Sequence, residues 1–424
     1  SPPQTGCRVD QAGPLRKPTD LRKKRKKRSI QQLKNADGTL QHQTEKKKHI
    51  VKSFFEKLYS REDIPEENMQ HYLKRKGLPM IPEKNKEEIN REITLKELQE
   101  AILKQKNNKT LGPDGLPGEL YKTLQEKLEM QLLELFYEVL TTAKLPKSWG
   151  KTYIRLIPKE DLDHQLIQNY RPISLLNVDY KLFMSIMIIH SDQNGFLPNR
   201  QIKNNTRMVM NIIEYYEANL GKQLAMVFLN AQKAFDNVNW QFIIQQLKSI
   251  QFGNKFIKLI STIYMTQMAS VILNGDRTEM FKINKGIRQG CPLSPLLFIL
   301  NLENLLENIR KNEEIKRALI KKEHYKVQAF AEDIVFFLED PEDMGVKLIK
   351  EIEEFGKVAG LKINKNKTKL LTKNLKDKQQ KELEGKLGMQ RVKKLKYLGV
   401  WLTARCSSIK KDNYDKLIIQ IKKN

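Results

Sequence analysis

Carboxylates stand beside apolar runs at two places in the sequence. In the first, Leu224–Leu229 precedes Asn230–Asp236 (NAQKAFD), and in the second, Ala329–Asp333 (AFAED) precedes the apolar run Ile334–Leu338. A strand end opposite a hairpin tip could hold two Mg²⁺ ions about 3.5–4 Å apart, the arrangement that supports in-line phosphoryl transfer. Taken alone, the pair Glu332-Asp333 is weak evidence, because adjacent acids at a turn are usually solvated surface.

Hydrophobic periodicity predicts the elements that would position these residues. Apolar runs predict strands over 153–158, 224–229 and 394–402, and two strands within 327–338 that meet at a charged tip. Helical spacing predicts helices over 50–59, 119–140, 206–220, 241–250 and 351–358. A capping box at Thr94 and Glu97 predicts a further helix start, as does Ser294 followed by Pro295. This mixture predicts an α+β fold.

The composition favours a polyanionic partner. Lys+Arg number 77 against 50 Asp+Glu, a formal net charge of +27 over 424 residues. Such a surplus points to nucleic acid or an anionic membrane surface, whereas 39% hydrophobic residues are too many for a disordered polycation. Three scattered cysteines are too few for a disulfide framework or a zinc site. No apolar stretch approaches the ~18 residues of a membrane span, and no signal peptide is evident. A secreted or integral membrane protein is therefore not expected.

One unbroken basic run lies near the start of the chain and consists of Arg22, Lys23, Lys24, Arg25, Lys26, Lys27 and Arg28. It could be a nuclear-localisation signal or a phosphate-binding patch. It could equally be part of a solvated, disordered leader, and these interpretations are compatible. The run favours a nuclear location over a cytoplasmic one.

Nine sequence blocks in order resemble the reverse transcriptase domain of the LINE-1 class of non-LTR retrotransposons (the ORF2-like protein). They are LGPDGLPGELYK (111–122), IRLIPK (154–159), NYRPISLLNVDYK (169–181), SDQNGFLPNRQIKNN (191–205), AQKAFDNVNW (231–240), GIRQGCPLSPLLF (286–298), AFAEDIVFFLED (329–340), GLKINKNKTK (360–369) and LKYLGVWLT (395–403). Nine ordered blocks do not coincide by chance. The resemblance covers roughly residue 30 onward.

This resemblance implies a right-hand polymerase with fingers, a palm built on a four-stranded sheet, and a partial thumb. The implied regions are a basic, disordered leader (1–49), an N-terminal helical extension leading into the fingers (50–149), the fingers and palm core (150–402) and the start of a truncated thumb (403–424). Residues 60–93 are polar and charged, and are expected to form a linker or extended arm.

The resemblance also assigns roles to single residues. Asn230, Glu332 and Asp333 occupy the positions of the catalytic, Mg²⁺-binding acids. Phe235 would be the steric gate that blocks a ribose 2′-hydroxyl and so selects dNTP substrates. The implied nucleotide-binding residues are Arg155, Lys159, Arg171, Gln289, Gly290 and Lys367. For each basic residue, non-specific contact with phosphate is the alternative. The implied partners are RNA and an RNA/DNA primer–template, with a nucleoprotein complex as a further option.

The sequence departs from the family at three points. Position 230 is Asn where the family has Asp, so one negative charge is missing from the metal site. Position 332 is Glu where the family has Asp, which moves the carboxylate oxygens by about a bond length. The segment 182–190 is shorter than its counterpart in the family. We therefore expect a domain that binds RNA or primer–template with impaired catalysis. The alternatives are an active RNA-templated DNA polymerase and a basic structural component of a nucleoprotein particle.

Overall fold

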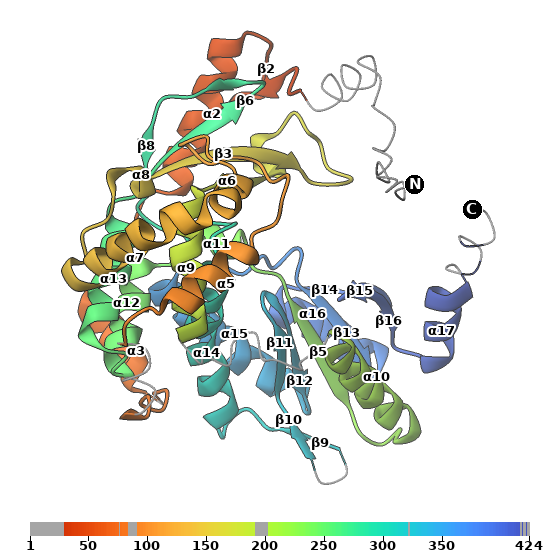
Figure 1. Ribbon diagram of the computed structural model, residues 1–424. Helices are drawn as coiled ribbons and strands as arrows, with labels where there is room; N and C mark the ends of the chain where they lie inside the picture. Colours follow the sequence, from red (N-terminus) through yellow and green to blue (C-terminus); the bar gives the residue numbers. More distant parts are fainter. Residues whose placement is uncertain are drawn as a thin grey trace, which may run out of the picture.

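The computed structural model describes residues 29–75, 77–83, 91–190, 202–320 and 323–415, with positions 418 and 421. Two five-stranded sheets lie in separate halves of the molecule, one in the upper part and one in the lower part of Figure 1. The basic run 22–28 and residues 191–201 lie outside the described residues.

The lower sheet, here called the palm sheet, is built around a buried central strand. Its order is β11-β12-β5-β13-β14. The bounds are β5 (Leu224–Leu229), β11 (Val327–Phe330), β12 (Asp333–Leu338), β13 (Lys369–Lys373) and β14 (Gln390–Arg391). All of β5 is buried, which explains why a continuous apolar run encodes it. The expectation of four strands is wrong by one, because the short β14 adds parallel to β13.

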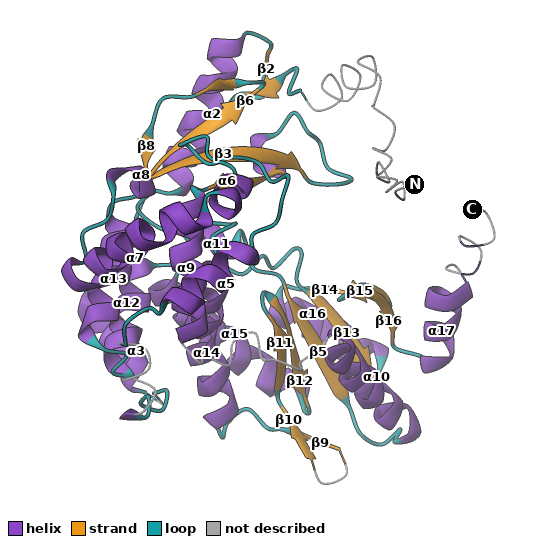
Figure 2. Cartoon of the chain, viewed as in Figure 1, coloured by secondary structure: helices purple, strands orange, loops and turns teal. Residues whose placement is uncertain are grey.

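Helices cover both faces of the palm sheet (Figures 1 and 2). They are α10 (Ile202–Ala218), α14 (Ser294–Lys311), α15 (Pro341–Ala359) and α16 (Asp377–Leu387), each of which contacts a strand of this sheet. Helices α11 (Ala234–Asn237) and α12 (Trp240–Ser249) follow β5 along the chain, and α12 packs on α14. Alternate residues of β5 belong to different cores: Val227 packs with α14 and α15, whereas Met226 and Phe228 pack with α10. In α14, Leu293 is the N-cap and Ser294 the first helical residue, one position from the prediction.

The upper sheet, here called the fingers sheet, has the order β4-β3-β6-β7, with β8 also paired to β6. Its strands are β3 (Lys151–Pro158), β4 (Tyr170–Leu175), β6 (Met268–Leu273), β7 (Asp276–Arg277) and β8 (Phe281–Lys282). Helix α2 (Thr44–Leu58) lies against β6 and β8. The remaining elements of this half are α5 (Leu95–Leu103), α6 (Gly118–Thr123), α7 (Gln125–Thr142), α8 (Lys147–Gly150), the 3-10 helix η1 (Ile167–Asn169), α9 (Val178–His190) and α13 (Asn254–Met265).

The N-terminal region is more ordered than the sequence predicts. Strands β1 (Leu33–Lys34) and β2 (Leu40–Gln41) and the first turn of α2 lie within the expected leader. Buried Lys47 anchors this segment by donating hydrogen bonds to the carbonyls of Ile30 and Gln31, both at 3.0 Å. Helix α3 (Glu66–Lys74) forms inside the expected linker, because its buried Met69 and Tyr72 pack on the main core.

Other predictions had mixed outcomes. The capping box at Thr94 and Glu97 is confirmed at the start of α5. The single helix over 119–140 is wrong: the chain leaves helical geometry at Leu124, which separates α6 from α7. The strand character over 394–402 is confirmed. The segment is a hairpin of β15 (Lys394–Tyr397) and β16 (Val400–Thr403), turned by Leu398 and Gly399 at positive φ.

The remaining described elements are the hairpin β9 (Ala318–Ile320) and β10 (Glu323–Tyr325), the helix α17 (Cys406–Lys410) and the π-helix η3 (Lys411–Asp415). Among the described helices, none combines the length and the apolar character that crossing a bilayer would require.

Candidate active site

The two acidic segments meet at one edge of the palm sheet. Strand β12 pairs with β5 so that Ile334 lies opposite Leu229. Continuing this antiparallel register by one residue places Asp333 opposite Asn230. Both residues are exposed and line a pocket of about 310 Å³, together with Lys367. The structure therefore brings together three of the residues that the sequence singled out.

The hairpin β11–β12 presents the acidic pair at its tip. Phe330 pairs with Asp333, which leaves Ala331 and Glu332 as a two-residue loop. Ala331 has a φ of 52°, in the left-handed region that such tight loops require and that costs energy for a residue with a Cβ. This turn places exposed Glu332 beside Asp333.

Backbone contacts fix the segment that carries Asn230. Its N–H donates to Thr368 Oγ1 at 3.1 Å, and its carbonyl accepts from the N–H of Asn364 at 2.8 Å. Two residues further on, the N–H of Gln232 donates to the carbonyl of Lys362 at 2.7 Å. The block GLKINKNKTK therefore holds the strand end in place and leaves the Asn230 side chain at the pocket.

The donor set at this edge suits a hard divalent cation. Amide and carboxylate oxygens of Asn230, Glu332 and Asp333 are ligands that Mg²⁺ accepts. Partial burial, and then repulsion from the neighbouring Glu332 carboxylate, raise the pKa of Asp333 above its usual value. Within the described residues, no group of three or more His, Cys, Asp or Glu side chains could hold a metal ion. The site thus fits a cation but supplies only two carboxylates.

Three predicted phosphate ligands share one face of the fingers sheet. Arg155, Ile157 and Lys159 alternate along β3 and its end, and Arg171 lies directly opposite Ile157, so the three cationic side chains leave the same face. Burial, and repulsion from Lys367 and Arg171, lower the pKa of Lys159. This repulsion shows that Lys367, on the palm side, lies near the end of the fingers hairpin.

The ring of Phe235 packs against α14. The residue is half-buried, and its ring stacks on Phe298 with centroids 4.5 Å apart and planes 14° from parallel. Its carbonyl accepts a hydrogen bond from the N–H of Ile287 at 2.8 Å. The ring is therefore held both by stacking and by its own backbone.

Gln289 and Gly290 pack against β4. The Gln289 carbonyl accepts from the N–H of Ser174 at 2.8 Å, and a Cβ on Gly290 would lie 2.9 Å from the Ser174 carbonyl oxygen. Gly290 also has a φ of 112°, so both the close approach of Ser174 and the positive φ require glycine at this position. The close backbone approach that the structure shows at this glycine is to the fingers sheet.

Sequence reasoning missed a buried cluster around Asp236. Asp236 is 3% exposed and accepts a hydrogen bond from the hydroxyl of Tyr59 at 3.0 Å. Burial raises the pKa of Asp236 to about 6, against the opposing effects of Tyr59, Lys233 and Lys159. Burial also lowers the pKa of Lys233 to about 8, and its Nζ lies 4.0 Å from the ring centroid of Phe54. The block AQKAFD draws attention to Asp236 in the sequence. Its partner Tyr59, however, is 177 residues away, and no local pattern links the two.

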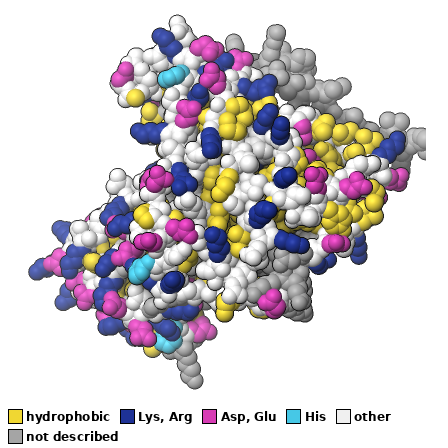
Figure 3. Space-filling view, turned by 90° about the vertical axis from the view of Figure 1, so that its left-hand side faces the viewer, with side chains coloured by type: hydrophobic (Ala, Val, Ile, Leu, Met, Phe, Trp, Pro, Cys, Tyr) yellow, Lys and Arg dark blue, Asp and Glu magenta, His cyan; other side chains and the backbone are white. Residues whose placement is uncertain are grey.

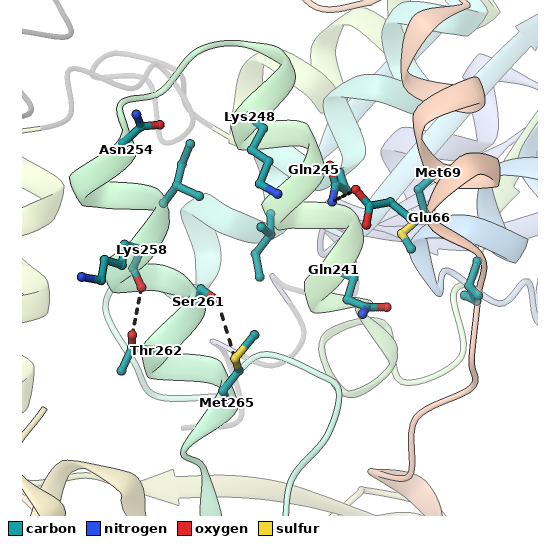
Figure 4. Close-up of a pocket in the computed structure, with 13 residues that line it drawn as sticks. Glu66, Met69, Gln241, Gln245, Lys248, Asn254, Lys258, Ser261, Thr262 and Met265 are labelled. Atoms are coloured by element: carbon teal, nitrogen blue, oxygen red, sulfur yellow. Dashed lines mark hydrogen bonds between the residues drawn. The ribbon is translucent and has the colours of Figure 1, made fainter. Parts of the chain in front are cut away.

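A second hollow has no predicted site residue in its wall. It measures about 450 Å³ and lies between α12, α13 and the start of α3 (Figure 4). On one side Gln245 Nε2 donates to Glu66 Oε1 at 2.7 Å. On the molecular face that contains α7, α12 and α13, Lys and Arg side chains are scattered among acidic and apolar ones (Figure 3). Charge on this face therefore does not single out a site.

Comparisons with known proteins identify the family of this chain. The family model for reverse transcriptase (RNA-dependent DNA polymerase) matches residues 157–402. The uncharacterized 149 kDa protein of transposon TX1 from Xenopus laevis is 30% identical over 407 residues, 90% of this chain and 30% of that protein. The Pol polyprotein of the type-2 retrotransposable element R2DM from Drosophila melanogaster is 26% identical over 268 residues, 60% of this chain and 24% of that protein. The chain thus spans less than a third of these relatives.

Among solved structures, a Candida tropicalis telomerase in complex with a fragment of telomeric RNA aligns with 70% of this chain and 49% of its own. The sequence identity is 14% and the TM-score is 0.42. The family match is independent of this alignment and covers both sheets from the end of β3 to β16. The chain belongs to the reverse transcriptase family, and its relatives are proteins of non-LTR retrotransposons.

Proposed function

We propose that this chain is the reverse transcriptase domain of a LINE-1-like element that binds RNA and RNA/DNA primer–template but polymerises poorly. The observation that carries the proposal is the place of Asn230, which ends the central palm strand opposite Asp333. An amide at this position keeps an oxygen donor but removes one of the charges that would face the metal ions.

The expected cost follows from the chemistry of the site. Hard Mg²⁺ prefers carboxylates, and its charge dominates the electrostatics of such a site. A loss of several kcal/mol of transition-state stabilisation corresponds to about 10²-fold or more in rate. Glu332 keeps its charge, but a displacement near 1 Å can also cost about 10²-fold. Both changes affect one site, so their costs need not multiply.

The other side chains supply binding and selection. Two Mg²⁺ ions at Asn230, Glu332 and Asp333 would supply activation of a primer 3′-hydroxyl and stabilisation of pyrophosphate. Arg155, Lys159, Arg171 and Lys367 would bind the triphosphate through charge-assisted hydrogen bonds. Phe235 would exclude a 2′-hydroxyl, while Gln289 and Gly290 would line the site of the new base pair. The excess of basic residues would hold the nucleic-acid backbone, with an affinity that falls steeply with salt.

The decisive experiment is primer extension on an RNA template with dNTPs, in Mg²⁺ and then in Mn²⁺. The chain as given is compared with the Asn230→Asp, Glu332→Asp double variant. The matched control is Asn254→Asp, which makes the same exchange at an exposed position of α13. We expect extension by the double variant at least about 10²-fold above the chain as given and the control.

Each outcome selects one function. Efficient extension by the chain as given would overturn impaired catalysis and establish an active polymerase. Extension only by the double variant would support the proposal. If neither extends a primer, RNA binding decides: a preference for primer–template over an equally charged polyanion such as heparin retains the binding role. Binding that follows charge alone would favour the basic structural component of a nucleoprotein particle.

A further inference from the structure

Buried Asp236 has no role in the proposed chemistry, yet it follows the predicted steric gate directly. Only 3% of Asp236 is exposed, and its carboxylate faces Tyr59, Lys233 and Lys159. The Asp236 carboxylate accepts a hydrogen bond from the Tyr59 hydroxyl at 3.0 Å. If this bond is lost, an oxygen of the buried carboxylate has no donor, which costs free energy of folding.

Tyr59 is itself held rigidly at the end of α2. Its N–H donates to the carbonyl of Phe55 at 2.9 Å, and its carbonyl accepts from the N–H of Asn284 at 3.0 Å. The rings of Phe55 and Tyr59 stack with centroids 5.9 Å apart. The phenol therefore has little freedom to follow Asp236 if the segment around Asp236 moves.

The backbone around Asp236 is equally confined. The N–H of Asp236 donates to the carbonyl of Lys233 at 2.9 Å. Gly286 packs so closely that a Cβ there would lie 2.6 Å from the Asp236 carbonyl oxygen. The next residue of the same loop, Ile287, donates its N–H to the Phe235 carbonyl at 2.8 Å. The residue beside the gate is thus fixed through its backbone by the loop 286–287 and through its side chain by α2.

We infer that Tyr59 and Asp236 are positioning residues that set the place of the Phe235 ring and, through it, the discrimination between deoxyribose and ribose. The inference rests on the proposed function, because it needs a nucleotide at this site. Neither residue contacts the sugar. The hydrogen bond ties the helical N-terminal extension to the gate, so a segment far away in sequence controls substrate choice.

The test compares the binding of dCTP and CTP to the chain on primer–template in Mg²⁺, measured by displacement of a fluorescent nucleotide. It needs no turnover. Tyr59→Phe removes only the hydroxyl, and Asp236→Ala removes the acceptor. We expect each to lower the preference for dCTP by about tenfold, since a shift near 1 Å can change positioned interactions by up to 10²-fold. The double variant should be no worse than either single variant, because both remove the same bond.

Three controls separate positioning from general damage. Tyr72 in α3 is also 3% exposed, and its hydroxyl donates a hydrogen bond to Glu351 Oε1 at 2.8 Å. Tyr72→Phe removes this bond and should leave the preference unchanged. Asp236→Asn keeps an oxygen acceptor for Tyr59 and should restore most of the preference. Phe235→Ala should abolish the preference and make a further Tyr59→Phe exchange silent.

The outcomes distinguish this inference from the proposed function. If the chain as given binds neither nucleotide, this inference is overturned, whereas the proposed binding of RNA and primer–template is judged by RNA binding itself. If it prefers dCTP, and Tyr59→Phe lowers both affinities equally or changes neither, the inference alone is overturned. The same holds if Tyr72→Phe changes the preference as much as Tyr59→Phe does.

Discussion

Asp333 and Asp236 are two acids near the same end of β5, and their surroundings are opposite. Asp333 lies exposed at a hairpin edge beside a second carboxylate. Asp236 is buried and has a phenol and two lysines as neighbours. Burial raises the pKa of both acids; repulsion from Glu332 adds to this effect at Asp333, whereas Tyr59, Lys233 and Lys159 oppose it at Asp236.

The difference separates a ligand-binding acid from a structural one. A solvated carboxylate beside another carboxylate is stabilised when a cation binds, so Asp333 suits a metal site. A buried carboxylate with its own hydrogen-bond donor and cations needs no external ligand, so Asp236 serves the arrangement of the chain. We therefore expect changes at Asp333 to affect chemistry and changes around Asp236 to affect stability and positioning.

The largest effect should follow from Asp333→Asn. In the Asn230→Asp, Glu332→Asp background, we expect primer extension to fall by at least about 10³-fold, because a charged metal ligand is lost. Thermal unfolding should hardly change, because exposed positions usually contribute within about 0.5 kcal/mol. Extension assays and calorimetry on the same preparation measure both. A large fall in melting temperature would contradict the assignment of Asp333 as a ligand.

Gly286→Ala should strongly destabilise the segment around Asp236. A Cβ at this glycine would lie 2.6 Å from the Asp236 carbonyl oxygen, and φ is +85°. We expect a loss of roughly 3–4 kcal/mol of unfolding free energy, the sum of backbone strain and a clash. The control is Gly275→Ala, at a φ of +104° with no atom within 4 Å, which should cost about 1 kcal/mol. Urea unfolding measures both, and equal losses would refute the close packing.

Asp236→Asn should change how stability depends on pH. The folded-state pKa of Asp236, about 6, is above its ordinary value of 3.8, so the folded state binds more protons between these values. The contribution of Asp236 to stability therefore falls as pH rises from about 4 to 6. Relative to Asp236→Asn, the loss should be about 3 kcal/mol at 1.36 kcal/mol per pKa unit. Urea unfolding at pH 4, 5, 6 and 7 tests this, and parallel curves would contradict it.

The smallest effect should come from the fingers cations. Arg155→Gln and Arg171→Gln should each weaken the binding of inorganic tripolyphosphate by about tenfold, or ~1.4 kcal/mol. Arg310→Gln is the control, because Arg310 pairs with Glu303 and Glu307 on α14. Calorimetric titration without metal measures the affinities. A loss at Arg310 as large as at the other two would show that binding follows net charge alone.

The same contrast explains which parts could be predicted. The strand over 224–229 and the hairpin over 327–338 are confirmed, because buried strands carry continuous apolar runs and the acids directly flank them. Strands β13 and β14 of the same sheet were not predicted. Helix α3 was missed, because its few apolar residues sit among charges and only packing on Phe242 and Phe355 favours it. The break at Leu124 was missed because apolar periodicity continues through it.

The sequence by itself determined the family, the α+β class and the place of Asn230, Glu332 and Asp333 at the palm edge. These depend on residue types and short spacings, and backbone register carries them directly into space. Only the tertiary structure decided that Tyr59 meets Asp236, that Lys367 approaches Lys159, and that the glycine at 290 packs on β4. Such contacts depend on how distant segments pack, because burial and charge select partners that no local pattern records.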